Sequence, residues 1–474
     1  MNRKHYGLII LLSVIGGLFF SRCDLKKQNS SVSSSTLNND ETVDYCVNNA
    51  FGNPITGNCA EYYNGVTYIA YQGEKEDPYV VAYNHKESKW IGPYKAGVSL
   101  LGKNPNKKID NHGKPTLVVD SEGYIHVAFG GHGGTPDLGE NTLGNYNGGK
   151  QIHVKSKRPM DISSWEEVDN ISPFGTYSQF IKMDNGDIYL FYRHGAHRSN
   201  WVYQVSKDNC RTFSPLVSFL KAKPFADDGE KLNIWDSWYV ALEKGKNDDI
   251  HVLYNFHKCR SKNGVHVGER YNAYFMTLDT KTNTWRNIND KVLKLPLTKE
   301  DSDILTLAVE TPGKWTHLGD LSFDKDLFPR IYWYEGEDNG TQYGGAKRLA
   351  NYYWNGSEWI GGSTNLPVEA RGELDLLSSD SVRYLLASTK DSHSEIAWWV
   401  SDKQGKDFRK SKTVINGKEK FMLSHFVVNG TEDAYIVATQ KIAGTDYSKL
   451  YLIGNSGVIK REKSKADVIP LKIE

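Results

Sequence analysis

Hydrophobic and polar positions alternate in short runs along most of the chain, and turn residues separate the runs. Residues 114–120 are rich in β-branched side chains, residues 120–123 (DSEG) have the composition of a tight turn, and residues 124–129 form a second run. This order is typical of a strand, a turn and a second strand. It predicts a β-hairpin with His112 before the first strand and His132 after the second, so that both histidines lie at its open end.

The same pattern recurs along the chain as a turn rich in Asp, Asn or Gly, followed by an aromatic and β-branched run. The seven copies span residues 64–69, 120–129, 184–190, 248–253, 324–333, 380–385 and 432–437. Their spacing is about 60 residues, which is typical of a four-stranded propeller blade. We therefore predict an all-β fold, a seven-bladed β-propeller over residues 45–474.

An eight-residue motif supports this fold class. Residues 206–213 (SKDNCRTF) match the Asp-box turn S-x-D-x-G-x-x-[WF], with Cys210 in place of glycine, and residues 401–408 (SDKQGKDF) are a looser copy. Side-chain bonds to backbone amides close turns of this kind. The motif marks a fold and is typical of propellers in sialidases and related carbohydrate-active proteins.

Composition narrows the possible partners. Aromatic residues make up 12% of the chain, with 28 Tyr and 12 Trp beside 43 Gly and 15 Pro, which favours sheets with tight turns over helical bundles. The chain has 58 basic and 57 acidic residues. This balance gives no sign of a nucleic-acid-binding protein, so an anionic partner must meet a local basic patch.

The N-terminus is predicted to be an export signal. Basic residues 2–5 precede an apolar run at 8–20 and then Cys23, which indicates a signal peptide over 1–23 and a flexible linker over 24–44. The segment resembles a bacterial lipoprotein signal, with Cys23 lipidated and the protein held at the outer membrane or cell surface by this anchor alone. Arg22 departs from that pattern and leaves a secreted or periplasmic protein as the alternative.

Two cysteines near the start of the predicted propeller are candidates for a disulfide bond. Cys46 and Cys59 are close in sequence, and an exported protein meets an oxidising environment. We predict a disulfide between them.

The propeller topology sorts the candidate polar residues. In a blade, the loops entering the first strand and the loops joining the second to the third strand open on one face. The residues that this rule places on one face, contributed by three consecutive blades, are His112, Tyr177 and Tyr239 near first strands and His132, Arg193, His194, His197, His257, Cys259 and His266 after second strands.

This mixture of side chains suits β-elimination on a uronic acid. The reaction needs a cation on the carboxylate, a base for the C5 proton and an acid for the leaving oxygen. Arg193 can bind a carboxylate bidentately, while Tyr177 and a histidine can transfer protons. We expect the charge of Arg193 to favour the deprotonated form of Tyr177.

Four segments carry a family resemblance. The strings HGKP at 112–115, GHGG at 131–134 and YRHGAH at 192–197, together with Tyr177, resemble the propeller ulvan lyases and are most similar to polysaccharide lyase family 25. The resemblance implies cleavage of ulvan, a sulfated algal polysaccharide, between sulfated rhamnose and uronic acid, giving unsaturated uronate-ended oligosaccharides without an organic cofactor.

The resemblance also implies roles for residues at matching positions. His112, His132, Tyr177 and Arg193 would be catalytic, and Tyr239 and His194 would contact the substrate. Which of Tyr177 and the histidines is base and which is acid stays open, as do glucuronate or iduronate preference, endo or exo action and oligomeric state.

A second cluster indicates a metal. His257, Cys259 and His266, with His197 from the neighbouring blade, provide nitrogen and sulfur donors suited to tetrahedral zinc. Members of the resembled family can carry a structural zinc, so we predict one here. Cys210 is a less suitable ligand because its turn should open on the opposite face.

Two other functions remain open. A sialidase-like Asp-box hydrolase would need several arginines and a tyrosine–carboxylate pair, which we cannot assemble from the sequence. A non-catalytic cell-surface glycan-binding propeller would need only aromatic loops, for which Trp235 and Trp238 are candidates.

Overall fold

The computed structural model describes residues 44–47, 58–102, 109–224, 234–262, 265–324, 327–378, 381–443 and 447–461. All of these residues belong to one compact unit. Among the described residues, no helix has the length and apolar character needed to cross a membrane. The predicted signal peptide and the linker up to residue 43 lie outside the described residues.

The described part of the unit is all-β, as predicted, and is built from antiparallel four-strand groups in sequence order. The first three groups are β2 (Ala60–Tyr63), β3 (Val66–Gln72), β4 (Pro78–Asn84) and β5 (Lys89–Lys95); β6 (Thr116–Val119), β7 (Ile125–Gly134), β8 (Gly148–Arg158) and β9 (Asp161–Val168); and β10 (Thr176–Lys182), β11 (Ile188–Arg193), β12 (Trp201–Ser206) and β13 (Val217–Leu220).

The later groups follow the same order. They are β14 (Ile234–Lys244), β15 (Asp249–Lys262), β16 (Val265–Asp279) and β17 (Thr284–Arg286), with β18 (Leu307–Val309) beside β16; β19 (Lys314–Phe323), β20 (Pro329–Glu337), β21 (Arg348–Trp354) and β22 (Trp359–Ser363); β23 (Arg371–Ser378), β24 (Ser381–Lys390), β25 (His393–Asp402) and β26 (Arg409–Gly417); and β27 (Phe421–Thr431), β28 (Ala434–Lys441) and β29 (Tyr447–Gly454), with β30 (Gly457–Val458) and β1 (Asp44–Val47) paired to β29. The short helices are η3 (Glu74–Glu76), η4 (Asn111–Gly113), η5 (Pro136–Leu138) and α2 (Lys299–Leu305).

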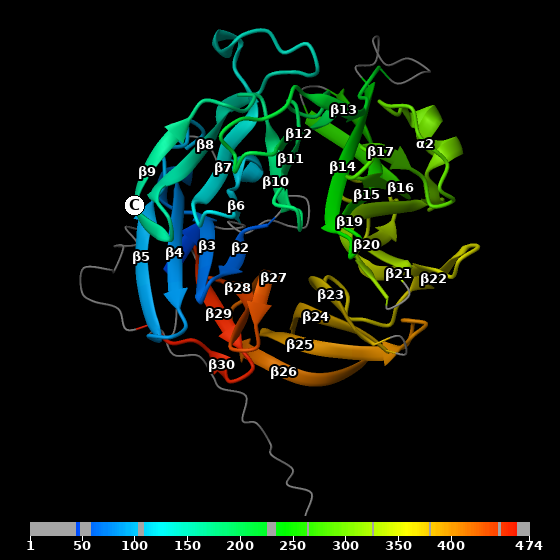
Figure 1. Cartoon of the computed structure of the whole chain (residues 1–474). Coiled ribbons are helices and arrows are strands. Elements are labelled where there is room, and N and C mark those ends of the chain that lie inside the picture. The colour runs from blue at the N-terminus through cyan, green and yellow to red at the C-terminus, as the bar shows by residue number, and fades with distance from the viewer. Residues whose placement is uncertain are drawn as a thin grey trace, which may run out of the picture. The chain divides into compact units, whose positions relative to one another are not determined.

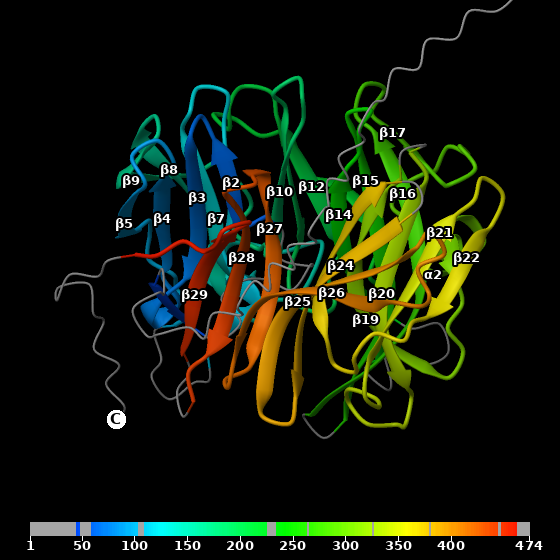
Figure 2. The same cartoon turned by 90° about the horizontal axis from the view of Figure 1, so that it is seen from below.

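The first strand of each group lies against the first strand of the next. Contacts run from β2 to β6, β10, β14, β19, β23 and β27 in turn, and β27 pairs in parallel with β2. Figures 1 and 2 show the groups following one another around a common centre. Because β1 pairs with β29, a strand from the N-terminal end completes the group built by the C-terminal strands.

Burial of both faces explains why these strands read as nearly continuous apolar runs. In β11, Ile188, Leu190 and Tyr192 belong to a cluster shared with β6 and β7. The intervening Tyr189 and Phe191 belong to a second cluster shared with β12 and β14. Since successive strand residues point to opposite faces, each group is held between its neighbours by both sets of side chains.

The predicted repeats coincide with this architecture. Each of the repeated turns falls where the first strand of a group meets its second, from β2–β3 to β27–β28. The sequence pattern therefore located the turn between the first and second strands of every four-strand group in the described part of the chain.

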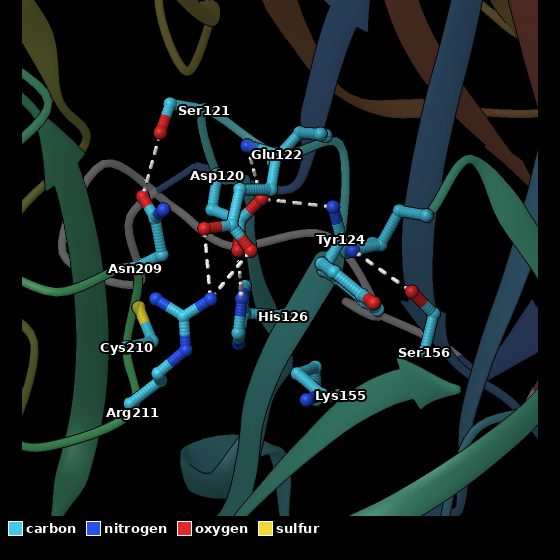
Figure 3. Close-up of polar contacts among 12 residues, drawn as sticks. Asp120, Ser121, Glu122, Tyr124, His126, Lys155, Ser156, Asn209, Cys210 and Arg211 are labelled. Atoms are coloured by element: carbon cyan, nitrogen blue, oxygen red, sulfur yellow. Dashed lines mark hydrogen bonds and ion pairs between the residues drawn. The ribbon is translucent and has the colours of Figure 1, made fainter. Parts of the chain in front are cut away.

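The predicted Asp-box turn joins β12 to β13. The Ser206 hydroxyl oxygen accepts from the Cys210 amide at 2.8 Å, and Asp208 Oδ1 accepts from the Thr212 amide at 2.9 Å. Figure 3 shows this turn beside the β6–β7 turn, with the Arg211 guanidinium donating to the Glu122 carboxylate at 2.6 and 2.8 Å. Cys210 therefore lies on the side where first and second strands are joined, as its topology predicted.

The structure contradicts the predicted Cys46–Cys59 disulfide, because Cys59 is a free, buried thiol. Cys46 belongs to β1, whereas Cys59 directly precedes β2. The strand order β1-β29-β28-β27-β2 places four strand spacings between them, about 19 Å at about 4.8 Å per strand. A disulfide requires Cα atoms within about 7 Å, so closeness in sequence does not give closeness in space here.

Candidate active site

The two histidines of the predicted hairpin meet at its open end. His112 lies in η4, directly before β6, and His132 lies near the end of β7. Their rings stack with centroids 3.7 Å apart and planes 15° apart. The His112 side chain keeps 26% of its surface exposed, compared with 8% for His132, so His112 is the more accessible of the two.

Asp110, which the sequence reasoning missed, joins the two rings. Its Oδ1 lies 2.6 Å from Nδ1 of His112, and its Oδ2 lies 2.7 Å from Nδ1 of His132. A carboxylate accepts hydrogen bonds, so each neutral ring carries its proton on Nδ1 and leaves Nε2 free of a proton. The Asp110 side chain also accepts from the His112 amide, as the N-cap of η4.

The charge states of this trio follow from its surroundings. Burial lowers the pKa of His112 to about 4; the neighbouring His132 and Arg193 act in the same direction, while Asp110 opposes them. Burial alone would raise the pKa of Asp110, but its hydrogen bonds with the two histidines bring that pKa far below its usual range. At neutral pH, Asp110 is ionised and His112 is neutral.

Tyr177 enters the same site from β10. Its ring centroid is 5.2 Å from that of His112. The backbone at Tyr177 has a φ of +59°, and the β10–β11 register shifts between Thr176 and Gln179. A left-handed tyrosine within a β-bulge is costly and re-aims the side chain, a combination that is common at functional sites.

The ionisation of Tyr177 differs from expectation. Burial and the nearby Tyr239 raise its pKa, although the positive charges of Arg193 and Arg270 oppose this. Arg193 lowers the pKa of Tyr177 as expected, but removal of the hydroxyl from water raises that pKa by more. Tyr177 is therefore protonated in the free protein.

Glycines allow β7 to approach the segment that carries Tyr177. A Cβ on Gly131 would lie 1.9 Å from the carbonyl oxygen of Gly175. Gly133 has a φ of +90°, a conformation that other residues rarely adopt. The glycines around His132 thus let the β7 backbone meet the segment that leads into Tyr177.

Arg193, at the end of β11, is fully buried. Its guanidinium carbon lies 4.9 Å from the Tyr177 ring centroid and 5.8 Å from that of Tyr239. Nε donates to the Gly195 carbonyl oxygen at 3.3 Å. Nη1 and Nη2 have no hydrogen-bond partner in the part of the chain that the structure describes. A buried cation with two unused donors is suited to binding an anion bidentately.

Tyr239 borders the site on the other side of Tyr177, with ring centroids 6.0 Å apart. Arg270, a second residue missed in the sequence, donates from Nη2 to the Tyr239 hydroxyl at 2.9 Å. His197 Nε2 lies 3.2 Å from the same hydroxyl. Arg270 lies in β16 opposite His257, so only strand register reveals its place in the site.

His194 does not contact the site as predicted. Its Nδ1 lies 2.8 Å from Asn141 Oδ1, and its Nε2 lies 2.8 Å from the Ser172 hydroxyl. Both ring nitrogens of this buried residue are used within the protein, which leaves none for a substrate. His194 fixes the loop after β11.

The predicted metal ligands are partly brought together. The His197 and His257 rings are 5.3 Å apart, and Cys259 lies two residues beyond His257 on the same side of β15. The His266 side chain lies outside the described side chains. Among the described residues, the only group whose donor atoms meet at metal-ligand separations is Asp110, His112 and His132, and its carboxylate already binds both rings.

Comparison with known proteins shows which family the chain resembles. Residues 66–363 match a family model described as BNR repeat-containing family member. An ulvan lyase of Nonlabens ulvanivorans is 46% identical over 98% of this chain and 99% of its own length. The ulvan lyase-PL25 of Pseudoalteromonas sp. (strain PLSV) is 42% identical over 96% of this chain and 94% of its own length. A solved PL25 ulvan lyase bound to -[GlcA(1-4)Rha3S]- has a TM-score of 0.84 at 42% identity, covering 90% of this chain and 98% of that one.

Proposed function

The chain belongs to the ulvan lyases of polysaccharide lyase family 25, and from this premise we propose that it cleaves ulvan between sulfated rhamnose and uronic acid by β-elimination. The observation that carries the proposal is the buried guanidinium of Arg193, with two unused donors, beside His112 and Tyr177. A substrate carboxylate supplies the missing anion, and its neutralisation makes the adjacent C5 proton more acidic.

The ionisation states suggest how the proton steps divide. His112 is neutral and holds its proton on Nδ1 through Asp110, so its Nε2 can accept the C5 proton. The C5–H electrons form the C4–C5 double bond, and the C4–O bond breaks. Tyr177, protonated because it is buried, gives its proton to the leaving oxygen. His132 shares Asp110 and holds the His112 ring by stacking.

Ultraviolet absorbance of ulvan incubated with the purified protein tests this function. Elimination leaves a conjugated double bond at the new non-reducing uronate, so absorbance should rise with time. New reducing ends without absorbance would indicate a sialidase-like hydrolase instead. Retention of ulvan with neither signal would indicate a binding propeller, although Trp238, one of its predicted aromatic contacts, is fully buried.

We also propose that the four-strand groups are the blades of a seven-bladed β-propeller. The repeated turns, the contacts between successive first strands and the parallel pairing of β27 with β2 support this arrangement. In such a ring, β1 would close the last blade by adding its outermost strand.

We propose a structural zinc held by His197, His257, Cys259 and His266, whose nitrogen and sulfur donors are the types that zinc prefers. The proximity of His197 to His257 supports it. Elemental analysis should find about one zinc per chain, lost in Cys259→Ser and kept in Cys210→Ser, which alters a thiol in the Asp-box turn. Zinc-free wild-type protein with an unchanged Tm would reject the site.

Export follows from the proposed function, because ulvan is an extracellular polymer. We propose that residues 1–23 are removed or processed, with Cys23 lipidated or the protein secreted. Mass spectrometry of the mature N-terminus separates the two, since only the first leaves a diacylglycerol-modified Cys23.

Asp110→Asn should lower kcat roughly 10²-fold to 10⁴-fold, because an amide cannot accept from both Nδ1–H groups. The acid limb of the wild-type pH–rate profile should follow His112, whose pKa is about 4. Asp110 raises that pKa, so the limb should move to lower pH in the variant. Rates measured across pH check this, and a lower Tm with an unmoved limb would leave Asp110 only a structural role.

A further inference from the structure

A cavity of about 500 Å³ adjoins the candidate active site. Asn111 and Lys114, on either side of His112, form one wall. The opposite wall comes from later strands: His317 in β19, Arg371 at the start of β23 and Lys420 just before β27. The cavity thus lies beside the segment that carries His112 and is lined by groups that the proposed chemistry does not use.

Lys114 is the first sign that this cavity binds an anion. The residue is 4% exposed and lines the cavity. Its ammonium makes no ion pair or side-chain hydrogen bond within the residues that the structure describes. Burial lowers its pKa to about 7. An unpaired buried cation costs folding free energy, and a bound anion would recover that cost.

Arg371 faces the same cavity from the other wall. Its guanidinium carbon lies 4.0 Å from the Tyr334 ring centroid. Nη1 is buried without a hydrogen-bond partner in the described part of the chain. The Glu369 carboxylate lies 3.9 Å from Nη2, beyond hydrogen-bond distance, so the guanidinium keeps donor capacity for a ligand.

The remaining charges leave the cavity basic. Glu373 pairs with His425, and Glu369 accepts from the Lys347 amide. Burial, followed by the charges of Arg371, Arg270 and Lys347, brings the pKa of His317 well below its ordinary value. The lining therefore has three cationic side chains, those of Lys114, Arg371 and Lys420, against the two carboxylates of Glu369 and Glu373, both of which already have partners within the protein.

A row of side-chain contacts also leads from the site to the strand that carries His317. The Arg270 guanidinium lies 4.0 Å from the Tyr239 ring centroid and 4.9 Å from that of Trp315. Trp315 lies in β19, two residues before His317. Arg270 and Trp315 therefore link Tyr239 to β19, the strand whose His317 lines the cavity.

We propose that this cavity is a second anion subsite, which binds an acidic group of ulvan outside the sugar pair being cleaved. The inference rests on the proposed lyase function. The repeat -[GlcA(1-4)Rha3S]- bound by the related enzyme has an acidic group on each sugar, so a chain anchored on Arg193 carries further oxyanions to either side. Lys114 and Arg371 bind one of them, a carboxylate or a sulfate, through charge-assisted hydrogen bonds.

Steady-state rates on long ulvan and on the shortest oligosaccharide that the enzyme still cuts test the subsite. Arg371→Met should raise KM for ulvan about tenfold and should raise it less for the short substrate. Desulfated ulvan distinguishes the ligands, because a KM penalty that disappears identifies a sulfate and one that persists identifies a carboxylate. Arg211→Met, which removes an exposed cation at the Asp-box turn, is the matched control and should leave both substrates unaffected.

Lys114→Met gives an independent readout. It should raise Tm, because it removes an unpaired buried charge, and should raise KM for ulvan about tenfold. A lower Tm with unchanged KM would make Lys114 structural and overturn the subsite. Equal losses on long and short substrates, or none on either, for Arg371→Met would also overturn it. Wild-type protein that produces no absorbance from ulvan would reject the lyase function itself.

Discussion

Tyr177→Phe is expected to lower kcat on ulvan by roughly 10²-fold to 10⁴-fold, the usual contribution of a positioned acid or base. Only the hydroxyl is removed, so the ring keeps its place beside His112 and under Arg193. KM should change little, because the Arg193 donors that bind the carboxylate remain. Initial rates from ultraviolet absorbance measure both constants.

A matched substitution controls for loss of a tyrosine hydroxyl in general. The Tyr63 hydroxyl donates to the Ser121 carbonyl oxygen at 3.3 Å, beside the β6–β7 turn and away from the site. Tyr63→Phe should therefore keep wild-type kcat. If Tyr177→Phe also kept kcat within a factor of ten, another group would have to protonate the leaving oxygen, and the assignment of Tyr177 would be wrong.

Much of the site was predictable because propeller loops obey a simple rule. His112, His132, Tyr177 and Arg193 are far apart in sequence, yet the rule that sorts loops by face placed them together. In the structure, the His112 ring centroid lies 3.7 Å from that of His132 and 5.2 Å from that of Tyr177. The Arg193 guanidinium lies over the Tyr177 ring. Turn composition and strand periodicity are local signals, and because they recur in every repeat they predict the position of each strand group.

Residues that act through other side chains were harder to find. Asp110 had a local signal, because an aspartate two residues before His112 can cap a short helix and accept from its amide. That signal says nothing of the second bond, to His132. Arg270 had no local signal at all, since its contact with Tyr239 depends on the register of β15 and β16.

The errors share a physical cause, which is that tertiary structure overrides local sequence. Cys46 and Cys59 are neighbours in the chain, but strand order separates them. His194 directly follows Arg193 in the chain, but both of its ring nitrogens are bound within the protein. Arg193 lies beside Tyr177 and lowers its pKa, as predicted. Burial, which the sequence does not reveal, raises that pKa by more, so the net shift is opposite to the predicted one.

Arg193→Met is expected to lower kcat/KM at least 10²-fold to 10³-fold, as does removal of other groups that stabilise developing negative charge, while raising the stability of the free protein. An unpaired buried ion destabilises the folded protein by several kcal/mol, whereas stacking of the guanidinium on two tyrosine rings stabilises it by about 1–2 kcal/mol. The first effect is larger, so methionine should raise Tm.

Arg193→Lys separates charge from geometry at the same position. Lysine keeps the cation but cannot bind a carboxylate with two parallel donors, so its kcat/KM should lie between those of wild type and Arg193→Met. Ulvan should raise the Tm of wild type and should not raise that of Arg193→Met, because the ligand stabilises only a protein that binds it. An Arg193→Met variant with lower Tm and near-normal rates would show that the guanidinium supports the fold and not the substrate. The expected result is a higher Tm together with a much lower kcat/KM. It would mean that the unpaired guanidinium destabilises the free protein and that the substrate carboxylate completes the ion pair on binding.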